Sequence, residues 1–283
     1  MPPFAIALLF FSAILHTTWN LLLKQSDDKY ISTWWAVFAG SVIFLPVLFF
    51  TGLPARETWT LLIASVVVEV VYYGLLSYAY NDSDFSLVYP LARGSAPALI
   101  AFWSILFLGE MPTPGGFTGL IIVILGLIIV GSSGLFSSQG KPHLKGIVLA
   151  LVIALLISIY SVIDGAAVKM TAAFPYAILV FFLAPAITSP LVMKRYGWRH
   201  MRSSWNEDRK RLFAIGLLTV FAYLLALAAY SIAPVSYSGA IRELSVVLGA
   251  FAGWKILGET LGRQRLLGSV VIFVGILVIA LFG

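Results

Sequence analysis

Four ionisable side chains lie inside long apolar segments, where burying a charge is costly. Glu69 interrupts the run VVVEVVYY, and Arg93 interrupts YPLARGSAP. Arg242 and Glu243 are adjacent in a third apolar run. Ionisable groups at such depth are uncommon and usually mark a path or site for a substrate or an ion. A guanidinium can bind an anion through two parallel hydrogen bonds, so both signs of charge together suit a zwitterionic molecule.

Polar and aromatic side chains accompany these charges. His16, Trp19 and Asn20 follow the helical spacing i, i+3, i+4 and therefore share one face, which either packs in a bundle or lines a cavity. Tyr73 and Tyr223 lie too deep in their segments for an interfacial aromatic belt. Ten residues form the predicted substrate-binding set: Arg242, Arg93, Glu69, His16, Trp19, Asn20, Tyr73, Tyr89, Tyr223 and Glu243.

The composition defines the class of protein. Of 283 residues, 60% are hydrophobic and 11% are charged, which is too apolar for a soluble core and typical of a polytopic membrane protein. The chain has no cysteine, which excludes disulfides and cysteine-based metal or nucleophile chemistry. No phosphate-binding loop, HExxH or GxSxG motif occurs. We therefore predict no enzyme, catalytic residue, cofactor, metal site or nucleic-acid partner.

The apolar segments are long enough to position these side chains inside a membrane. A spanning helix needs about 20 mostly apolar residues. Ten segments meet this requirement and predict an all-α integral membrane protein: Pro3–Leu23, Ile31–Phe50, Thr58–Tyr80, Phe85–Leu108, Gly116–Gly134, Leu144–Val168, Phe174–Met193, Leu212–Ile232, Val235–Leu257 and Arg265–Phe282.

An internal repeat divides these segments into two groups of five. Ser86–Gly131 aligns without a gap with Val235–Ala280, and the alignment keeps an arginine, a Gly-Glu pair and two glycines in register. We predict one repeat at residues 1–139 and the other at 140–283. Because five is odd, the second repeat must enter the bilayer inverted relative to the first, an arrangement that recurs in secondary transporters.

Three motifs resemble those of one known family. HTTWNLLLK in the first segment, VYPLARGSAP in the fourth and LGE after the fourth and ninth are similar to the EamA family of the drug/metabolite transporter superfamily. The resemblance covers the whole chain. It implies helices one, two, six and seven around a centre formed by helices three, four, eight and nine, with helices five and ten at the periphery. It also implies export or exchange of small metabolites such as amino acids.

Depth within the segments predicts partners for the buried charges. Glu69 and Arg93 lie 12 residues on either side of Asn81, so an antiparallel hairpin would place them at one depth as an ion pair. The position matching Arg242 is the apolar Ala222, so Arg242 either pairs with an acid on another helix or contacts a substrate anion.

Other polar residues receive structural interpretations. We expect Asp164 to be an interfacial residue in water. Glu110 and Glu259 are expected to cap or anchor short turns at helix ends. The charged connection Lys194–Arg211 is expected to be a solvated loop, with a surface helix as the alternative.

These patterns favour a secondary transporter in the cytoplasmic (inner) membrane that exports a small, polar or zwitterionic, amino-acid-like metabolite by alternating access. Its partners are then the substrate and the lipid bilayer, with a proton on Glu69 or His16 as a candidate coupling ion, and the protein is a monomer or weak homodimer. A flippase of a lipid-linked substrate is the alternative, and an intramembrane enzyme is a weaker one.

Loop charges predict the orientation. The connections after the odd-numbered segments carry 14 Lys and Arg, whereas the opposite side carries only Arg56 and Lys169. The positive-inside rule then places both termini outside the cytoplasm. The family resemblance implies the opposite orientation, with both termini inside.

A single introduced cysteine distinguishes the two orientations. Ser203→Cys lies in the basic connection, which the charge bias places in the cytoplasm. We expect it to resist a membrane-impermeant thiol reagent in whole cells and to react after permeabilisation. Labelling in intact cells would show that the orientation implied by the family is correct.

Overall fold

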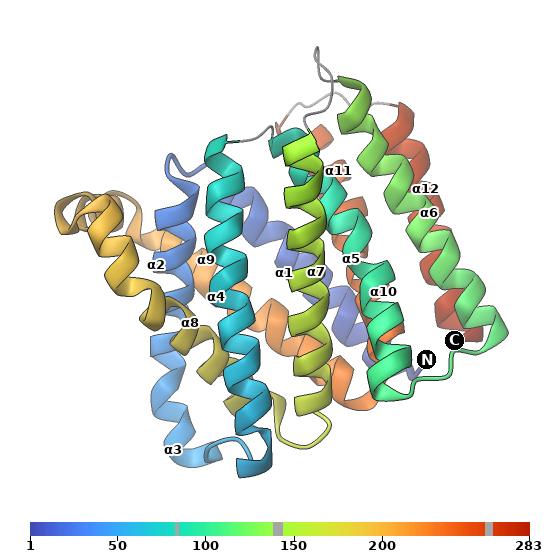
Figure 1. The fold of residues 1–283 in the computed structure, drawn as a ribbon, viewed down its shortest axis with the longest axis horizontal. Helices are drawn as coiled ribbons and strands as arrows, with labels where there is room; N and C mark the ends of the chain where they lie inside the picture. The colour runs from blue at the N-terminus through green and yellow to red at the C-terminus, as the bar shows by residue number, and fades with distance from the viewer. Residues whose placement is uncertain (83–84, 138–143, 258–262) are drawn as a thin grey trace.

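The computed structural model describes residues 1–82, 85–137, 144–257 and 263–283, and in these ranges it contains helices and no strand (Figure 1). The first half of the chain forms α1 (Pro3–Lys24), α2 (Lys29–Phe44), η1 (Leu45–Val47), α3 (Leu48–Thr51), η2 (Arg56–Thr58), α4 (Trp59–Asp82), α5 (Phe85–Leu108) and α6 (Pro114–Ser137). The second half forms α7 (Leu144–Ala167), α8 (Ala173–Tyr196), α9 (Trp198–Ile232), α10 (Val235–Arg242), α11 (Leu244–Leu257) and α12 (Arg263–Phe282).

All ten predicted apolar segments are helical in the parts described. Seven helices in those parts are long and apolar enough to cross a membrane. Two further apolar stretches, Ala92–Leu108 of α5 and Pro114–Val130 of α6, belong to helices of 24 residues each. The chain is therefore an all-α, multi-pass membrane protein. The count of ten membrane spans remains a prediction.

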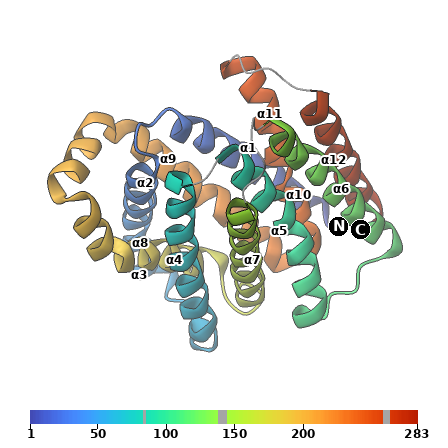
Figure 2. The same ribbon diagram turned by 45° about the horizontal axis from the view of Figure 1, so that its top comes forward.

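Glycines allow α6 and α12 to pack closely at one end of the bundle, where the two helices lie side by side (Figure 2). A Cβ added to Gly119 would lie 2.9 Å from the carbonyl oxygen of Gly275, and one added to Gly126 would lie 2.9 Å from that of Gly268. Since the contacts run in opposite order along the two helices, α6 and α12 are antiparallel. Gly119 aligns with Gly268 in the repeat and Gly126 with Gly275, so equivalent residues exchange partners, as at a two-fold axis.

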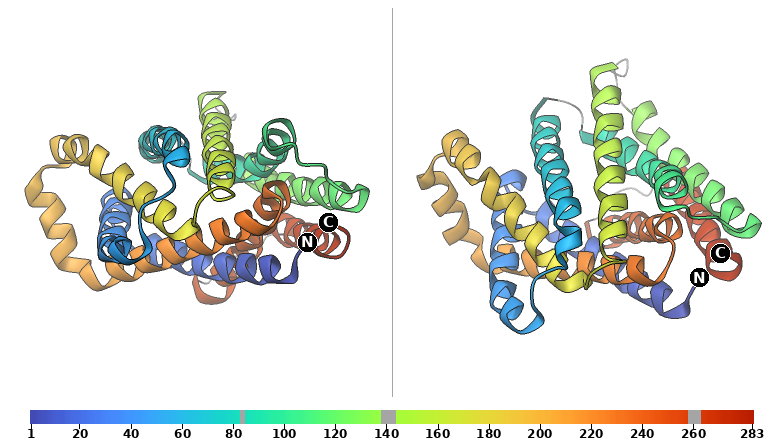
Figure 3. Two further views of the ribbon diagram at one scale, coloured as in Figure 1. Left: turned by 90° about the horizontal axis from the view of Figure 1, so that it is seen from below. Right: turned by 60° about the horizontal axis from the view of Figure 1, so that its bottom comes forward.

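The first helix of each half has matching neighbours. α1 packs along α9 and α11, whereas α7 packs along α4 and α5. The two termini lie together in every view, and the Met1 amino group donates a hydrogen bond of 2.6 Å to the Gly283 carbonyl (Figure 3). The bundle thus brings both ends of the chain to one side.

The connection Lys194–Arg211 is helical, so the expected solvated loop is wrong. α8 continues to Tyr196, a single residue with positive φ (Gly197, φ 76°) turns the chain, and α9 begins at Trp198. Non-helical dihedral angles at Asp208 (φ −133°, ψ 22°) separate the first ten residues of α9 from its apolar part. An apolar side chain explains the helix, because Met201 is fully buried against Trp34 and Val192.

The close α6–α12 contact leaves no room for a larger side chain. We expect Gly126→Leu to destabilise the protein by about 1–3 kcal/mol through overpacking and to lower its melting temperature in detergent. Gly74→Leu is the matched control, because a Cβ there has no neighbour within 4 Å. Equal melting temperatures for the two variants would contradict the packing described.

Candidate functional site

An ion pair joins the two halves of the chain near the centre of the bundle. Arg93 of α5 places Nη2 3.5 Å from Oε1 of Glu243, which lies between α10 and α11. The same Nη2 donates a hydrogen bond of 3.4 Å to Ser245 Oγ. The two charged side chains are 15% and 6% exposed, so the pair is largely desolvated.

The predicted ion pair between Glu69 and Arg93 is wrong. Glu69 is 4% exposed, and within the described ranges its Oε2 has no hydrogen-bond partner. α7 packs against both α4 and α5, and these two hairpin partners scarcely touch each other. Matched depth therefore does not bring the two side chains together. The acidic neighbour that acts electrostatically on Glu69 is Asp164 of α7.

A helix interruption positions Arg242 and Glu243. Glu243 ends α10 with φ −70° and ψ −3°, and its N–H bonds the carbonyl of Ala240 at 3.1 Å, as in a tight 3₁₀ turn. α11 begins at the next residue. Arg242 thus lies at a helix C-terminus, which favours a cation, and Glu243 precedes a helix N-terminus, which favours an anion.

Two tyrosines surround the Arg242 guanidinium. Nη1 donates a hydrogen bond of 2.9 Å to the Tyr230 hydroxyl. The guanidinium carbon lies 5.5 Å from the ring centre of Tyr223 and 5.9 Å from that of Tyr230, within the range of cation–π attraction. In the parts of the chain described, no carboxylate lies within ion-pair distance of Arg242, and its direct partners are phenols.

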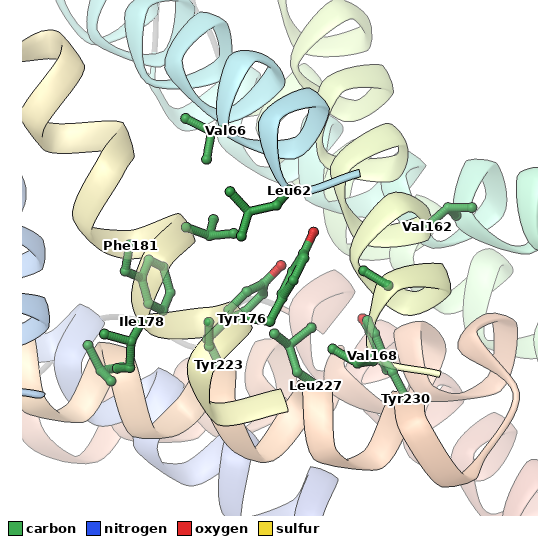
Figure 4. Packing of buried hydrophobic residues seen from close by; sticks show 14 of the residues in the cluster. Leu62, Val66, Val162, Val168, Tyr176, Ile178, Phe181, Tyr223, Leu227 and Tyr230 are labelled. Atoms are coloured by element: carbon green, nitrogen blue, oxygen red, sulfur yellow. The ribbon is translucent and has the colours of Figure 1, made fainter. Parts of the chain in front are cut away.

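Asp164 is buried, so its expected place at the aqueous interface is wrong. Its side chain is fully enclosed and accepts a hydrogen bond of 2.6 Å from the Tyr176 hydroxyl and a second from Tyr223. Figure 4 shows these two tyrosines side by side among Leu62, Phe181 and Leu227. The Tyr223 ring also contacts the Arg242 guanidinium. Asp164 therefore orients one of the two aromatic rings beside Arg242.

The face of α1 that carries His16, Trp19 and Asn20 lies near the two arginines. The His16 and Trp19 rings meet edge to face at 4.9 Å, and the charges of Arg93 and Arg242 both act on His16. Trp19 Nε1 is buried without a hydrogen-bond partner among the described residues. Asn20 instead donates to the His16 carbonyl at 2.7 Å, so its amide supports its own helix.

A small, partly open hollow lies between α2, α4 and α8. Tyr73 is its link to the charged centre of the bundle, because Glu69 lies one turn away on α4 and acts on the Tyr73 hydroxyl. The hollow is lined by Tyr30, Thr33, Trp34, Val37, Tyr73, Pro185 and Thr188. Tyr89 belongs to α5, but its side chain lies outside the described residues.

Three further tyrosines were not in the predicted set. Tyr176 and Tyr230 are described above, and Tyr160 interacts electrostatically with Arg242, Glu69 and Arg93. The contact between Asp164 and Tyr176 could have been predicted from the sequence. The two residues lie at equal distances on either side of the short α7–α8 connection and therefore at the same depth. Tyr230, the hydrogen-bond partner of Arg242, had no such signal in the sequence. No group of three His, Cys, Asp or Glu suited to a metal occurs in the residues searched.

Glu110 caps a helix, as expected. Its carboxylate accepts hydrogen bonds from the backbone N–H groups of Val235 (2.6 Å) and Ser236 (3.0 Å), the first residues of α10. Lys169 Nζ lies 3.5 Å away. The negative charge at the α10 N-terminus satisfies donors that a helix leaves open. The equivalent Glu259 lies outside the described residues.

A bundle of apolar helices with charges at its centre defines a polytopic membrane protein. The sequence profile of the EamA-like transporter family matches residues 3–132 and 144–281, so the chain belongs to that family, in two repeats. It is therefore a membrane transporter of the drug/metabolite type. No curated protein matches the chain. A solved structure described only as the crystal structure of a protein superposes with a TM-score of 0.74 at 18% identity over 99% of both chains, which establishes the fold alone.

The ion pair across the halves predicts a thermodynamic coupling. Arg93→Gln and Glu243→Gln should each destabilise the protein by about 3–5 kcal/mol, because each leaves a buried charge without its partner. The double variant should lose less than the sum, measured by thermal or denaturant unfolding.

The matched control combines Arg93→Gln with Glu69→Gln, and these effects should add. Additive losses for Arg93 and Glu243 would contradict the pair. A charge swap, Arg93→Glu with Glu243→Arg, that recovers no stability would also contradict the pair.

Proposed function

We propose that the protein is a secondary transporter in the cytoplasmic (inner) membrane that exports a small polar or zwitterionic, amino-acid-like metabolite by alternating access. The observation that carries this proposal is the environment of Arg242. This partly buried guanidinium lies at a helix interruption, and its direct described partners are phenols rather than a carboxylate. Interrupted helices near the midplane supply the substrate and ion sites of many secondary transporters.

The surrounding groups suggest how each part of a zwitterion is bound. Arg242 supplies two parallel donors for a carboxylate or phosphonate. Glu69, whose Oε2 is buried without a hydrogen-bond partner in the described parts, is the acceptor for an ammonium group. Tyr73, between Glu69 and the hollow, is positioned to contact an apolar part of the substrate.

Alternating access in this proposal is a rocking of one repeat against the other. The antiparallel exchange of glycine contacts between α6 and α12 supports ten spans arranged as two inverted repeats, residues 1–139 and 140–283. The Arg93–Glu243 pair bridges the repeats and would have to separate or shift as they move. A proton on Glu69 or His16 is the candidate coupling ion, and the working unit is a monomer or weak homodimer.

A flippase of a lipid-linked substrate is the second candidate. The hollow between α2, α4 and α8 favours it, because its lining is aromatic and apolar and its seven lining residues include no charged side chain. A lipid-linked substrate would compete with long-chain amphiphiles for binding. A water-soluble metabolite would not.

The test begins with a thermal-shift screen against amino acids, amines and organophosphonates. A stabilising ligand is then measured on Arg242→Lys, which keeps the charge but loses the planar pair of donors. We expect a nearly normal melting temperature and a ligand affinity lowered at least tenfold, about 1.4 kcal/mol. Arg265→Lys, at an exposed helix end, is the matched control. A normal ligand shift on a protein with a collapsed melting temperature would assign Arg242 a structural role.

A further inference from the structure

The first ten residues of α9, Trp198–Glu207, form a short helix between α8 and the apolar part of α9, and we call it the linker helix. It is bounded by the turn at Gly197 and by the break at Asp208. In Figure 1 it lies at the edge of the bundle, beyond α2 and α8. A short amphipathic helix joining two membrane helices is placed at the level of the lipid head groups.

Aromatic side chains fix the linker helix to α2. Trp35 Nε1 donates a hydrogen bond of 2.9 Å to the Met201 carbonyl, and the Trp35 ring lies 5.0 Å from Trp205 and 6.4 Å from Trp198. Trp198 remains 53% exposed. Tryptophans concentrate where the bilayer meets water, so this cluster anchors the helix at that depth.

The acids of this region already have protein partners. Ser203 donates to Glu207, Arg211 lies 3.0 Å from Asp208, and His200 lies 3.8 Å from Asp28. The exposed cations of the same region, in contrast to the acids, have no such partners in the part of the chain that the structure describes. Among the residues described, no ion pair or hydrogen bond engages the side chains of Lys194, Arg199, Arg202, Arg209 or Lys210.

We propose that the linker helix and its flanking residues form a binding surface for the head groups of anionic phospholipids. Five exposed cations without protein anions are held at head-group level by a tryptophan anchor. Arg199 and Arg202 are one helical turn apart and can contact one phosphate together. Each basic residue near an anionic membrane contributes about 1 kcal/mol, or about fivefold in binding.

The linker helix packs against a residue that also lines the hollow between α2, α4 and α8. Trp34 lines that hollow, donates to the Pro185 carbonyl of α8 at 3.0 Å and packs on Met201. Its neighbour Trp35 holds the linker helix. Lipid binding would therefore strengthen the packing of α2 against α8 and stabilise the folded protein.

The test uses the full chain in detergent, titrated with phosphatidylglycerol or phosphatidylcholine and examined by native mass spectrometry. Wild type should retain phosphatidylglycerol in preference to phosphatidylcholine. Arg199→Gln with Arg202→Gln should weaken that retention about 25-fold, whereas Arg199→Lys with Arg202→Lys should keep most of it. Arg263→Gln with Arg265→Gln removes the same charge from another exposed site, one outside the tryptophan anchor, and should weaken retention less than the 199/202 glutamine variant does.

Three results would overturn the proposal. The first is equal retention of the two lipids by wild type, and the second is equal loss in the 199/202 and 263/265 glutamine variants. The third is competition by inorganic phosphate as effective as that by the lipid, because it would assign the surface to a free anion. The lysine variant keeps the test decisive if the glutamine variant does not fold.

Discussion

The cost of burying charge in a bundle surrounded by lipid governs this structure. Moving an ion out of water costs several kcal/mol of solvation free energy unless other polar groups replace the solvent. The described core holds the carboxylates of Glu69, Asp164 and Glu243, and the guanidiniums of Arg93 and Arg242 are partly buried. Most obtain partners from a different helix, and one pair, Arg93 with Glu243, obtains them from different halves of the chain. Folding of the two halves and formation of the site are therefore linked.

The phenols explain how Arg242 is buried without an acid at contact distance. Two tyrosine rings present their faces to it, and one of them, Tyr223, is itself fixed by Asp164. Such a shell lowers the energy of the cation without neutralising it. An anion entering the site can then form the stronger charge-assisted bonds. This property distinguishes Arg242 from its repeat equivalent Arg93, whose charge is paired with that of Glu243.

The sequence predicted the features that depend on spacing along one chain. The positions of the apolar helices follow from the length of the apolar segments, and the cap by Glu110 from its place at a helix end. The repeat kept the glycines of α6 and α12 in register but did not predict that they contact each other. The sequence did not predict the partner of Arg93. The position of a residue along a hairpin gives its depth but not the direction in which its side chain points. In the structure α7 packs against both α4 and α5, so residues at one depth on these two helices need not meet. For Lys194–Arg211 a surface helix was only the alternative to a solvated loop, because the run of charges outweighed the single apolar anchor at Met201.

The central claim is that substrate binds where the two repeats meet, beside Arg93, Arg242 and Glu243. Ser245→Cys places a single thiol there in a chain with no cysteine, within reach of Arg93. The most direct measurement is its rate of alkylation by a small thiol reagent in purified protein, with and without a ligand that raises the melting temperature. The account predicts reaction in the empty protein and protection by the ligand. A thiol that does not react, or reacts equally fast in both conditions, would contradict it.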